Sequence, residues 1–271
     1  MDEILKAAPP GLREALAARG GSVEKAWREG PRAYLPADSP EGPLFARYSS
    51  AEEDVAALGY EAQVRALVGE SGPLRAPAVL DHGAGWLLER RVVPTEEPVE
   101  VVVAAAAEIA ALRLPPAPSV SPERWGLEPL VRRLRLLGRP RLAVELLRAR
   151  RLQARSKLPE VTIHGDFHPG NVLLAGGAAW VVDWELAGRG PAGLDLMRYW
   201  ATLEHAGDRE RLFAAAAELV GDELELARLR YAIAVVTAAD KLSHPRSLNR
   251  DPAGAASLLP LLPELRRDAR L

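Results

Sequence analysis

The chain has 271 residues, of which 35 are basic and 37 acidic, so its formal net charge is -2. It therefore lacks the overall positive charge that is typical of nucleic-acid-binding proteins. Hydrophobic residues make up 48% and charged residues 27%, which is ordinary for a folded globular protein and excludes disordered and collagen-like classes. The absence of cysteine excludes disulfides, cysteine zinc sites and cysteine nucleophiles.

The sequence predicts neither a membrane segment nor a leader. No stretch reaches the roughly 18 apolar residues that a membrane helix needs. Asp2 and Glu3 stand where a signal peptide would carry positive charge. Residues 132–157 hold ten basic residues and one acid without an aromatic residue among them, which favours solvated helix faces over nucleic-acid binding. We therefore expect a cytoplasmic protein with no membrane or nucleic-acid partner.

Residues 1–92 are predicted to form a small β-rich unit. Helical spacing covers residues 2–19, interrupted at Pro9 and Pro10, and a second helix is predicted over residues 51–68. Short segments bounded by Gly and Pro are typical of strands. The predicted strands are Val23–Arg28, Arg32–Leu35, Leu44–Tyr48, Val79–Leu80 and Trp86–Val92.

Residues 93–98 contain two prolines and are predicted to be a linker, after which residues 99–271 are mostly helical. The predicted helices are Val99–Leu114, Pro129–Leu137, Arg141–Lys157, Ala192–His205, Arg209–Val220, Glu223–Lys241 and Ala255–Arg267. The predicted strands in this part are Val161–Ile163, Val172–Leu174 and Ala179–Asp183. Together these patterns indicate the α+β class.

One polar segment lies between two apolar, strand-like runs and reads His164-Gly-Asp166-Phe-His168-Pro-Gly-Asn171. A second strand, Trp180-Val-Val, then ends in Asp183. A carboxylate, an amide oxygen and a second carboxylate at neighbouring strand ends suit magnesium binding and phosphoryl transfer. The rival interpretation is a zinc site made of His164, Asp166 and His168.

This pattern resembles the motifs of the aminoglycoside phosphotransferase and choline kinase family, which are small-molecule kinases with a protein-kinase-like, two-lobe fold. The resemblance implies a β-rich N-lobe over residues 1–92, a hinge over 93–98 and a larger helical C-lobe over 99–271. It implies ATP and Mg²⁺ as cofactors. By the same resemblance Asp166 is the catalytic base and Asn171 and Asp183 hold the metal. His164 and Asp195 support the catalytic loop.

The N-lobe matches the family less closely. Arg47 stands where the family has a lysine that contacts the ATP phosphates, and Glu61 fits the glutamate that pairs with it. Gly20 and Gly21 are the candidates for a glycine-rich phosphate loop. The run Glu89-Arg90-Arg91-Val92 resembles the hinge segment whose backbone meets the adenine.

Two functions follow from this sequence. The first is an ATP- and Mg²⁺-dependent phosphotransferase acting on a hydroxyl of a small molecule. The alternative is a non-catalytic, kinase-like protein that binds a nucleotide or another small ligand, because Arg47 replaces the lysine. The acceptor stays open among aminoglycosides, choline, homoserine and sugars, although six basic residues against three acids over residues 241–271 disfavour a polycationic antibiotic.

Overall fold

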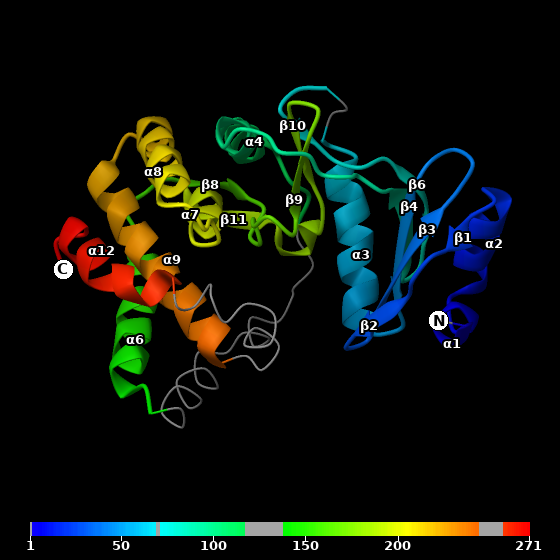
Figure 1. Ribbon diagram of the computed structural model, residues 1–271, viewed down its shortest axis with the longest axis horizontal. Coiled ribbons are helices and arrows are strands. Elements are labelled where there is room, and N and C mark those ends of the chain that lie inside the picture. Colours follow the sequence, from blue (N-terminus) through cyan, green and yellow to red (C-terminus); the bar gives the residue numbers. More distant parts are fainter. Residues whose placement is uncertain (1, 69–70, 117–137, 244–256) are drawn as a thin grey trace. The chain divides into compact units, whose positions relative to one another are not determined.

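The computed structural model describes residues 2–68, 71–116, 138–243 and 257–271, so the predicted helix over Pro129–Leu137 lies outside the described residues. These residues form two compact units (Figure 1). The sheet unit holds the chain up to Glu97, a short stretch that begins at Leu112, and Gly170–Ala187. The helical unit holds Pro98–Ala111, residues 138–169 and the described chain from Gly188 to Leu271.

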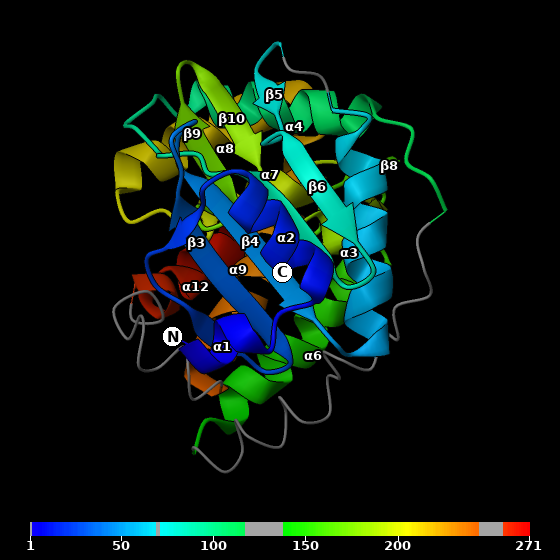
Figure 2. The same cartoon turned by 90° about the vertical axis from the view of Figure 1, so that its right-hand side faces the viewer.

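The sheet unit is built on an antiparallel sheet with the strand order β1-β3-β4-β7-β6, and β2 pairs with β3. Figure 2 shows the paired strands β3 and β4 side by side. The strands are β1 (Ser22–Val23), β2 (Trp27–Glu29), β3 (Arg32–Asp38), β4 (Leu44–Ser49), β6 (Val79–Gly83) and β7 (Trp86–Arg90). The short, turn-bounded segments of the sequence are thus strands.

Helices flank this sheet on both faces (Figure 1). They are α1 (Asp2–Lys6), α2 (Pro10–Ala18) and α3 (Glu52–Arg65). Side chains alternate along a strand, so the residues at every second position of β3 share one face. On this face Ala33, Leu35 and Ala37 pack in a core with Leu12 and Leu16 of α2. The opposite face carries the cross-strand pair Tyr34 and Arg47. Strand periodicity therefore separates the apolar core from the charged face of β4.

A second, three-stranded sheet in the same unit has the order β5-β10-β9. Its strands are β5 (Leu74–Arg75), β9 (Val172–Ala175) and β10 (Ala178–Val181), followed by a short 3-10 turn, η2 (Trp184–Leu186). Gly176 and Gly177 make the β9–β10 hairpin turn with φ of 60° and 70°, values that glycine adopts without strain. The hairpin brings Asn171 and Asp183 to the same end of the two strands.

The helical unit contains a two-stranded sheet, β8 (Glu160–Ile163) paired with β11 (Gly188–Pro191). Its helical elements are α4 (Glu100–Ala111), α6 (Pro140–Ala154), α7 (Leu194–Trp200), α8 (Ala206–Val220), α9 (Glu223–Ser243), η3 (Leu259–Leu261) and α12 (Leu262–Asp268). Helix α7 begins later than predicted because Gly193 has φ of 82°, which a right-handed helix does not accept. The mixed α+β class predicted from the sequence is confirmed.

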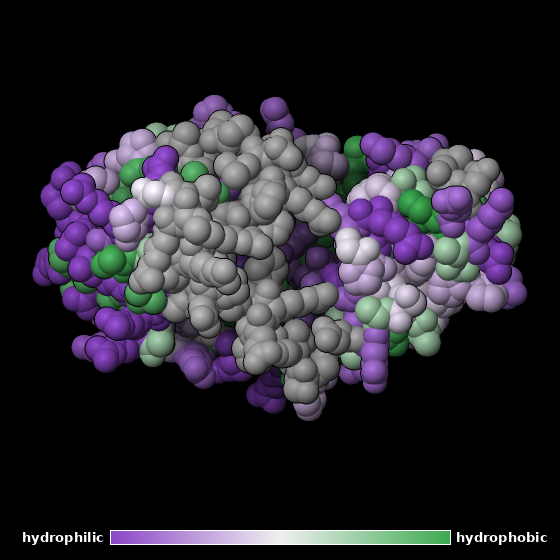
Figure 3. Space-filling view, turned by 90° about the horizontal axis from the view of Figure 1, so that it is seen from below, coloured by the Kyte–Doolittle hydropathy of each residue, from purple (hydrophilic) through white to green (hydrophobic). Residues whose placement is uncertain are grey.

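The surface of the described residues is largely hydrophilic on the face shown in Figure 3. The exposed large hydrophobic residues are Leu67, Val93, Val144, Leu219 and Leu271. Isolated residues of this kind are normal on protein surfaces. In the described part of the chain, every helix is too short or too polar to cross a bilayer.

Candidate active site

The loop after β8 is held by a buried carboxylate. Asp195, at the start of α7, accepts the backbone N–H of His164 at 2.7 Å and that of Gly165 at 3.0 Å. Gly165 has φ of 85°, a conformation that a side chain would strain. Burial raises the pKa of Asp195, although electrostatic interactions with His164 and hydrogen bonds from the two N–H groups oppose the shift. Asp195 therefore fixes the backbone immediately before Asp166.

Asp166 lies on this loop with its side chain 37% exposed. Arg198 Nη1 is 3.4 Å from its Oδ1, and His168 Nε2 is 3.5 Å from its Oδ2. Burial would raise the pKa of Asp166, but the hydrogen bond and charge of His168, together with Arg198 and His164, outweigh burial and lower it. The carboxylate is thus ionised at neutral pH and can accept a proton.

His164 faces the loop rather than a metal. It is fully buried, its Nδ1 accepts the N–H of Asp166 at 3.3 Å, and its ring packs edge-on against Phe167 at 6.0 Å. Among the residues that the structure describes, no group of three His, Asp or Glu side chains is arranged to hold a metal ion. The arrangement therefore does not support the zinc interpretation of His164, Asp166 and His168.

Asp183 follows β10 in the sheet unit with φ of 63°, an uncommon value for a residue other than glycine. Its N–H donates to Glu61 Oε1 at 3.0 Å, and its Oδ1 lies 3.1 Å from Arg47 Nη1. Its side chain is 28% exposed. On the other strand of the hairpin, next to β9, the backbone carbonyl of Asn171 accepts a hydrogen bond from the N–H of Val182 at 2.9 Å. Glu61 thus holds the unusual backbone that presents the Asp183 carboxylate.

Arg47, on β4, is buried and forms an ion pair with Glu61 on α3. Burial would lower the pKa of Arg47, but Glu61, Glu89 and Asp183 together raise it. Burial would likewise raise the pKa of Glu61, but Arg47 and Arg65 lower it. Both side chains therefore stay charged inside the sheet unit.

The predicted hinge residues differ in their surroundings. Glu89 is buried and paired with Arg65. The Nη2 atom of Arg90 lies 3.1 Å from Oε2 of Glu41. The exposed Arg91 forms a similar ion pair, with Nη1 3.2 Å from Oε2 of Glu24, and Val92 is half-buried. Their role in binding a base stays a prediction.

A family model described as the phosphotransferase enzyme family matches residues 28–231. The chain belongs to this family. The match runs from within β2 into the first part of α9 and includes both the Asp166 loop and the Arg47 network. Phosphotransfer to a small molecule is the activity that the family supports, and the resemblance found in the sequence is confirmed. None of the curated proteins matches the chain.

Solved structures of family members share the fold at low sequence identity. A macrolide 2'-phosphotransferase from Brachybacterium faecium aligns with a TM-score of 0.59 at 15% identity, over 93% of this chain and 99% of its own. A choline/ethanolamine kinase family protein from Mesorhizobium loti aligns with a TM-score of 0.60 at 19% identity, and the alignment covers 98% of this chain and 94% of that protein. The streptomycin–ATP complex of an aminoglycoside phosphotransferase, APH(2")-IIa, aligns with a TM-score of 0.58 at 11% identity, and the alignment covers 95% of this chain and 98% of that protein. The kinase-like fold is therefore shown.

Two charged residues beside the predicted site residues, Arg65 and Arg198, lie outside the family motifs. Arg65 Nε lies 3.1 Å from Glu61 Oε1, and the i,i+4 spacing of the two on a helix is a signal for this contact. Arg198 lies one helical turn after Asp195 and so reaches the loop that Asp195 holds. Neither distance follows from the family motif itself.

The glycine-loop candidates lie at a helix end. Gly20 donates to Ala17 and Gly21 to Leu16, so both close the last turn of α2. Between β2 and β3 the turn contains Gly30, with φ of 62°. Arg32, next to this turn, pairs with Asp54 at 2.6 Å and with Glu185.

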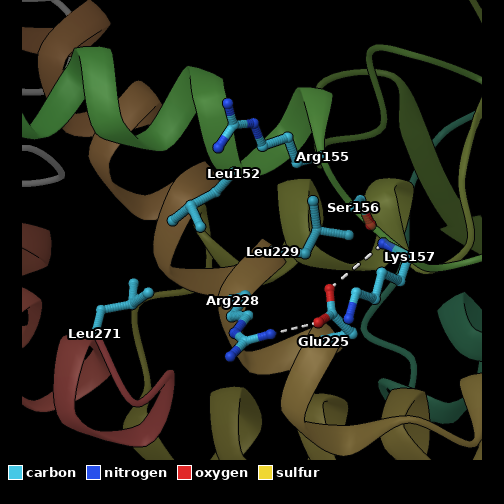
Figure 4. Close-up of a pocket in the computed structure, with 8 residues that line it drawn as sticks. All are labelled: Leu152, Arg155, Ser156, Lys157, Glu225, Arg228, Leu229 and Leu271. Carbon is cyan, nitrogen blue, oxygen red and sulfur yellow. Dashed lines mark hydrogen bonds and ion pairs between the residues drawn. The ribbon is translucent and has the colours of Figure 1, made fainter.

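A cavity of about 240 Å³ lies in the helical unit away from these residues (Figure 4). It is lined by Leu152, Arg155, Ser156, Lys157, Glu225, Arg228, Leu229 and Leu271. Within it Arg228 Nη1 pairs with Glu225 at 2.5 Å, and the Lys157 N–H donates to the same carboxylate at 3.4 Å. No residue predicted for phosphoryl transfer lines this cavity, so it is not part of the candidate site.

Proposed function

We propose that the protein is an ATP- and Mg²⁺-dependent kinase that transfers the γ-phosphate to a hydroxyl of a small molecule. The observation that carries the proposal is the state of Asp166: ionised, half-exposed and fixed by a loop whose backbone binds Asp195. Asp166 accepts the hydroxyl proton as the acceptor oxygen attacks phosphorus. His164 and Asp195 hold the loop in place.

The residues present fit a magnesium–nucleotide complex. Asp183 and Asn171 offer a carboxylate and an amide, and Mg²⁺ usually takes one or two protein ligands together with phosphates and waters. The partly exposed Asp183 carboxylate is held on a fixed backbone by Glu61. When bound, the metal would neutralise phosphate charge. Arg47 would bind phosphate oxygens, with Glu61 orienting its guanidinium.

The nucleotide proposed is ATP, which is present in the APH(2")-IIa complex, whereas another family structure is a complex with GDP and kanamycin. The segment over residues 89–92, including Glu89, Arg90, Arg91 and Val92, is proposed to meet the base through its backbone. The division into an N-lobe over 1–92, a hinge over 93–98 and a C-lobe over 99–271, and a cytoplasmic location, belong to the same proposal.

The alternative function is nucleotide or small-ligand binding without turnover. One observation favours it: Arg47 is already paired with both Glu61 and Asp183, so two of the groups proposed to serve the nucleotide neutralise each other. An arginine can exchange carboxylate for phosphate contacts, since both accept its planar fork. The complete set of Asp166, Asn171 and Asp183 favours turnover.

Calorimetry with ATP in the presence and absence of Mg²⁺ tests the metal role. We expect wild type to bind ATP more tightly with magnesium than without it. Asp183→Ala should lose this magnesium-dependent gain in affinity because the phosphate charge is no longer neutralised. Asp208→Ala, which removes a carboxylate of the helical unit that pairs with Arg211, is the control. Equal affinity with and without magnesium in wild type and Asp183→Ala would contradict the assignment.

A further inference from the structure

The side chains around the Asp166 carboxylate are basic. Arg198 and His168 each approach one of its oxygens, and their side chains are 40% and 39% exposed. Arg198 carries a permanent charge, and His168 becomes a cation when protonated. An acceptor whose hydroxyl reaches Asp166 from solvent therefore meets these two groups as well.

A second arginine adds to this charge. The pKa of Arg150, on α6, is lowered by partial burial and by the charge of Arg198, so the two guanidiniums repel each other. The contact found for Arg150 among the described residues is a 3.5 Å hydrogen bond to Gln153 rather than an ion pair. Neighbouring guanidiniums that share a single carboxylate, here Asp166 on Arg198, are suited to binding an additional anion.

Arg198 is also incompletely satisfied. Its buried Nε has no hydrogen-bond partner among the residues that the structure describes, and its ion pair with Asp166 uses Nη1 at 3.4 Å. The nearest acid on its own helix, Asp195, is buried and spends both oxygens on the backbone of the loop. Because 40% of the Arg198 side chain is exposed, its outer guanidinium N–H groups can donate to an oxyanion as well as to Asp166.

We infer that the acceptor is an anionic alcohol, a small molecule whose carboxylate or phosphate binds Arg198 and Arg150 while its hydroxyl reaches Asp166. This inference rests on the proposed kinase function. The hydroxyl proton passes to Asp166, its oxygen bonds to the γ-phosphorus, and the bond from that phosphorus to the bridging oxygen breaks. The products are the phosphorylated acceptor, ADP and a proton that Asp166 later releases. A polycationic or quaternary-ammonium acceptor would meet like charges at the same place.

Two matched sets of acceptors test this charge preference. The first is glycerate, glycerol and 3-aminopropane-1,2-diol, and the second is glucuronate, glucose and glucosamine. We expect the anion of at least one set to exceed both its neutral and cationic counterparts by about tenfold in kcat/KM with MgATP. Glycerol 3-phosphate as a further probe tells a phosphate preference from a carboxylate preference. A neutral or cationic member that equals or exceeds the anion in both sets overturns the inference.

Calorimetry without nucleotide separates this inference from the kinase function. Tighter binding of the anion than of its neutral counterpart, with an affinity that falls about tenfold in Arg198→Gln and in Arg150→Gln, supports the anionic site even if no phosphate is transferred. Arg198→Lys, which keeps the charge, should retain part of the preference, and all variants are checked by melting temperature. The control is Arg151→Gln, which changes an exposed arginine next to Arg150 on α6. If Arg198→Gln raises only the KM for MgATP, Arg198 serves the nucleotide and the inference fails.

Discussion

The Asp166 loop and the Arg47 network hold carboxylates in opposite ways. In the loop, Asp195 binds backbone N–H groups, so Asp166 keeps an exposed carboxylate for chemistry. In the network, Arg47, Glu61, Arg65 and Glu89 are all buried and neutralise one another. Backbone anchoring thus leaves a reactive group available, whereas mutual pairing makes a rigid support whose charges are already compensated.

The largest loss of stability is expected from Glu61→Ala. The change leaves Arg47 and Arg65 buried without the carboxylate that pairs with both of them. It also removes the acceptor for the Asp183 N–H. Breaking a buried ion pair on one side costs about 3 kcal/mol, which we expect in the free energy of unfolding measured with denaturant. Glu185→Ala, a half-buried acid nearby in the same unit, should cost less. An equal or smaller loss for Glu61→Ala would mean that the network does not support the sheet unit.

A smaller loss is expected from Asp195→Asn. The amide keeps one acceptor oxygen, so one of the two loop N–H groups loses its bond, at about 1–3 kcal/mol. Because that backbone positions Asp166, turnover should fall while affinity for the magnesium nucleotide stays unchanged. Unchanged kcat with reduced stability would show that Asp195 supports the fold without positioning the base.

The smallest effect is expected from Arg47→Lys. Lysine keeps the charge and reaches one acceptor instead of two. Nucleotide binding should therefore persist, with turnover equal to or above that of wild type, whereas Arg47→Ala should weaken both. Calorimetry and steady-state kinetics measure the two effects. If Arg47→Ala binds ATP as tightly as wild type, the arginine is not a phosphate clamp, and the binding-only alternative gains support.

The same two regions show how far the sequence could predict the molecule. Asp166, Asn171 and Asp183 stand close together in the chain between short apolar strands, so local pattern was enough to place them at strand ends. The pair Arg65–Glu89 joins a helix to a strand 24 residues away, and no local pattern reports such a contact. Strand β5 has two residues and pairs in parallel with the distant β10, so its existence depends on tertiary contacts alone.

The central claim is that Asp166 is the base of a magnesium-dependent phosphoryl transfer. Turnover of wild type and Asp166→Asn, measured as ADP formed with an accepted alcohol, tests it most directly. We predict a loss of at least about a hundredfold in the variant, as expected for removal of a positioned base. Its melting temperature and affinity for the magnesium nucleotide should stay near those of wild type. A folded Asp166→Asn with full activity would contradict the claim.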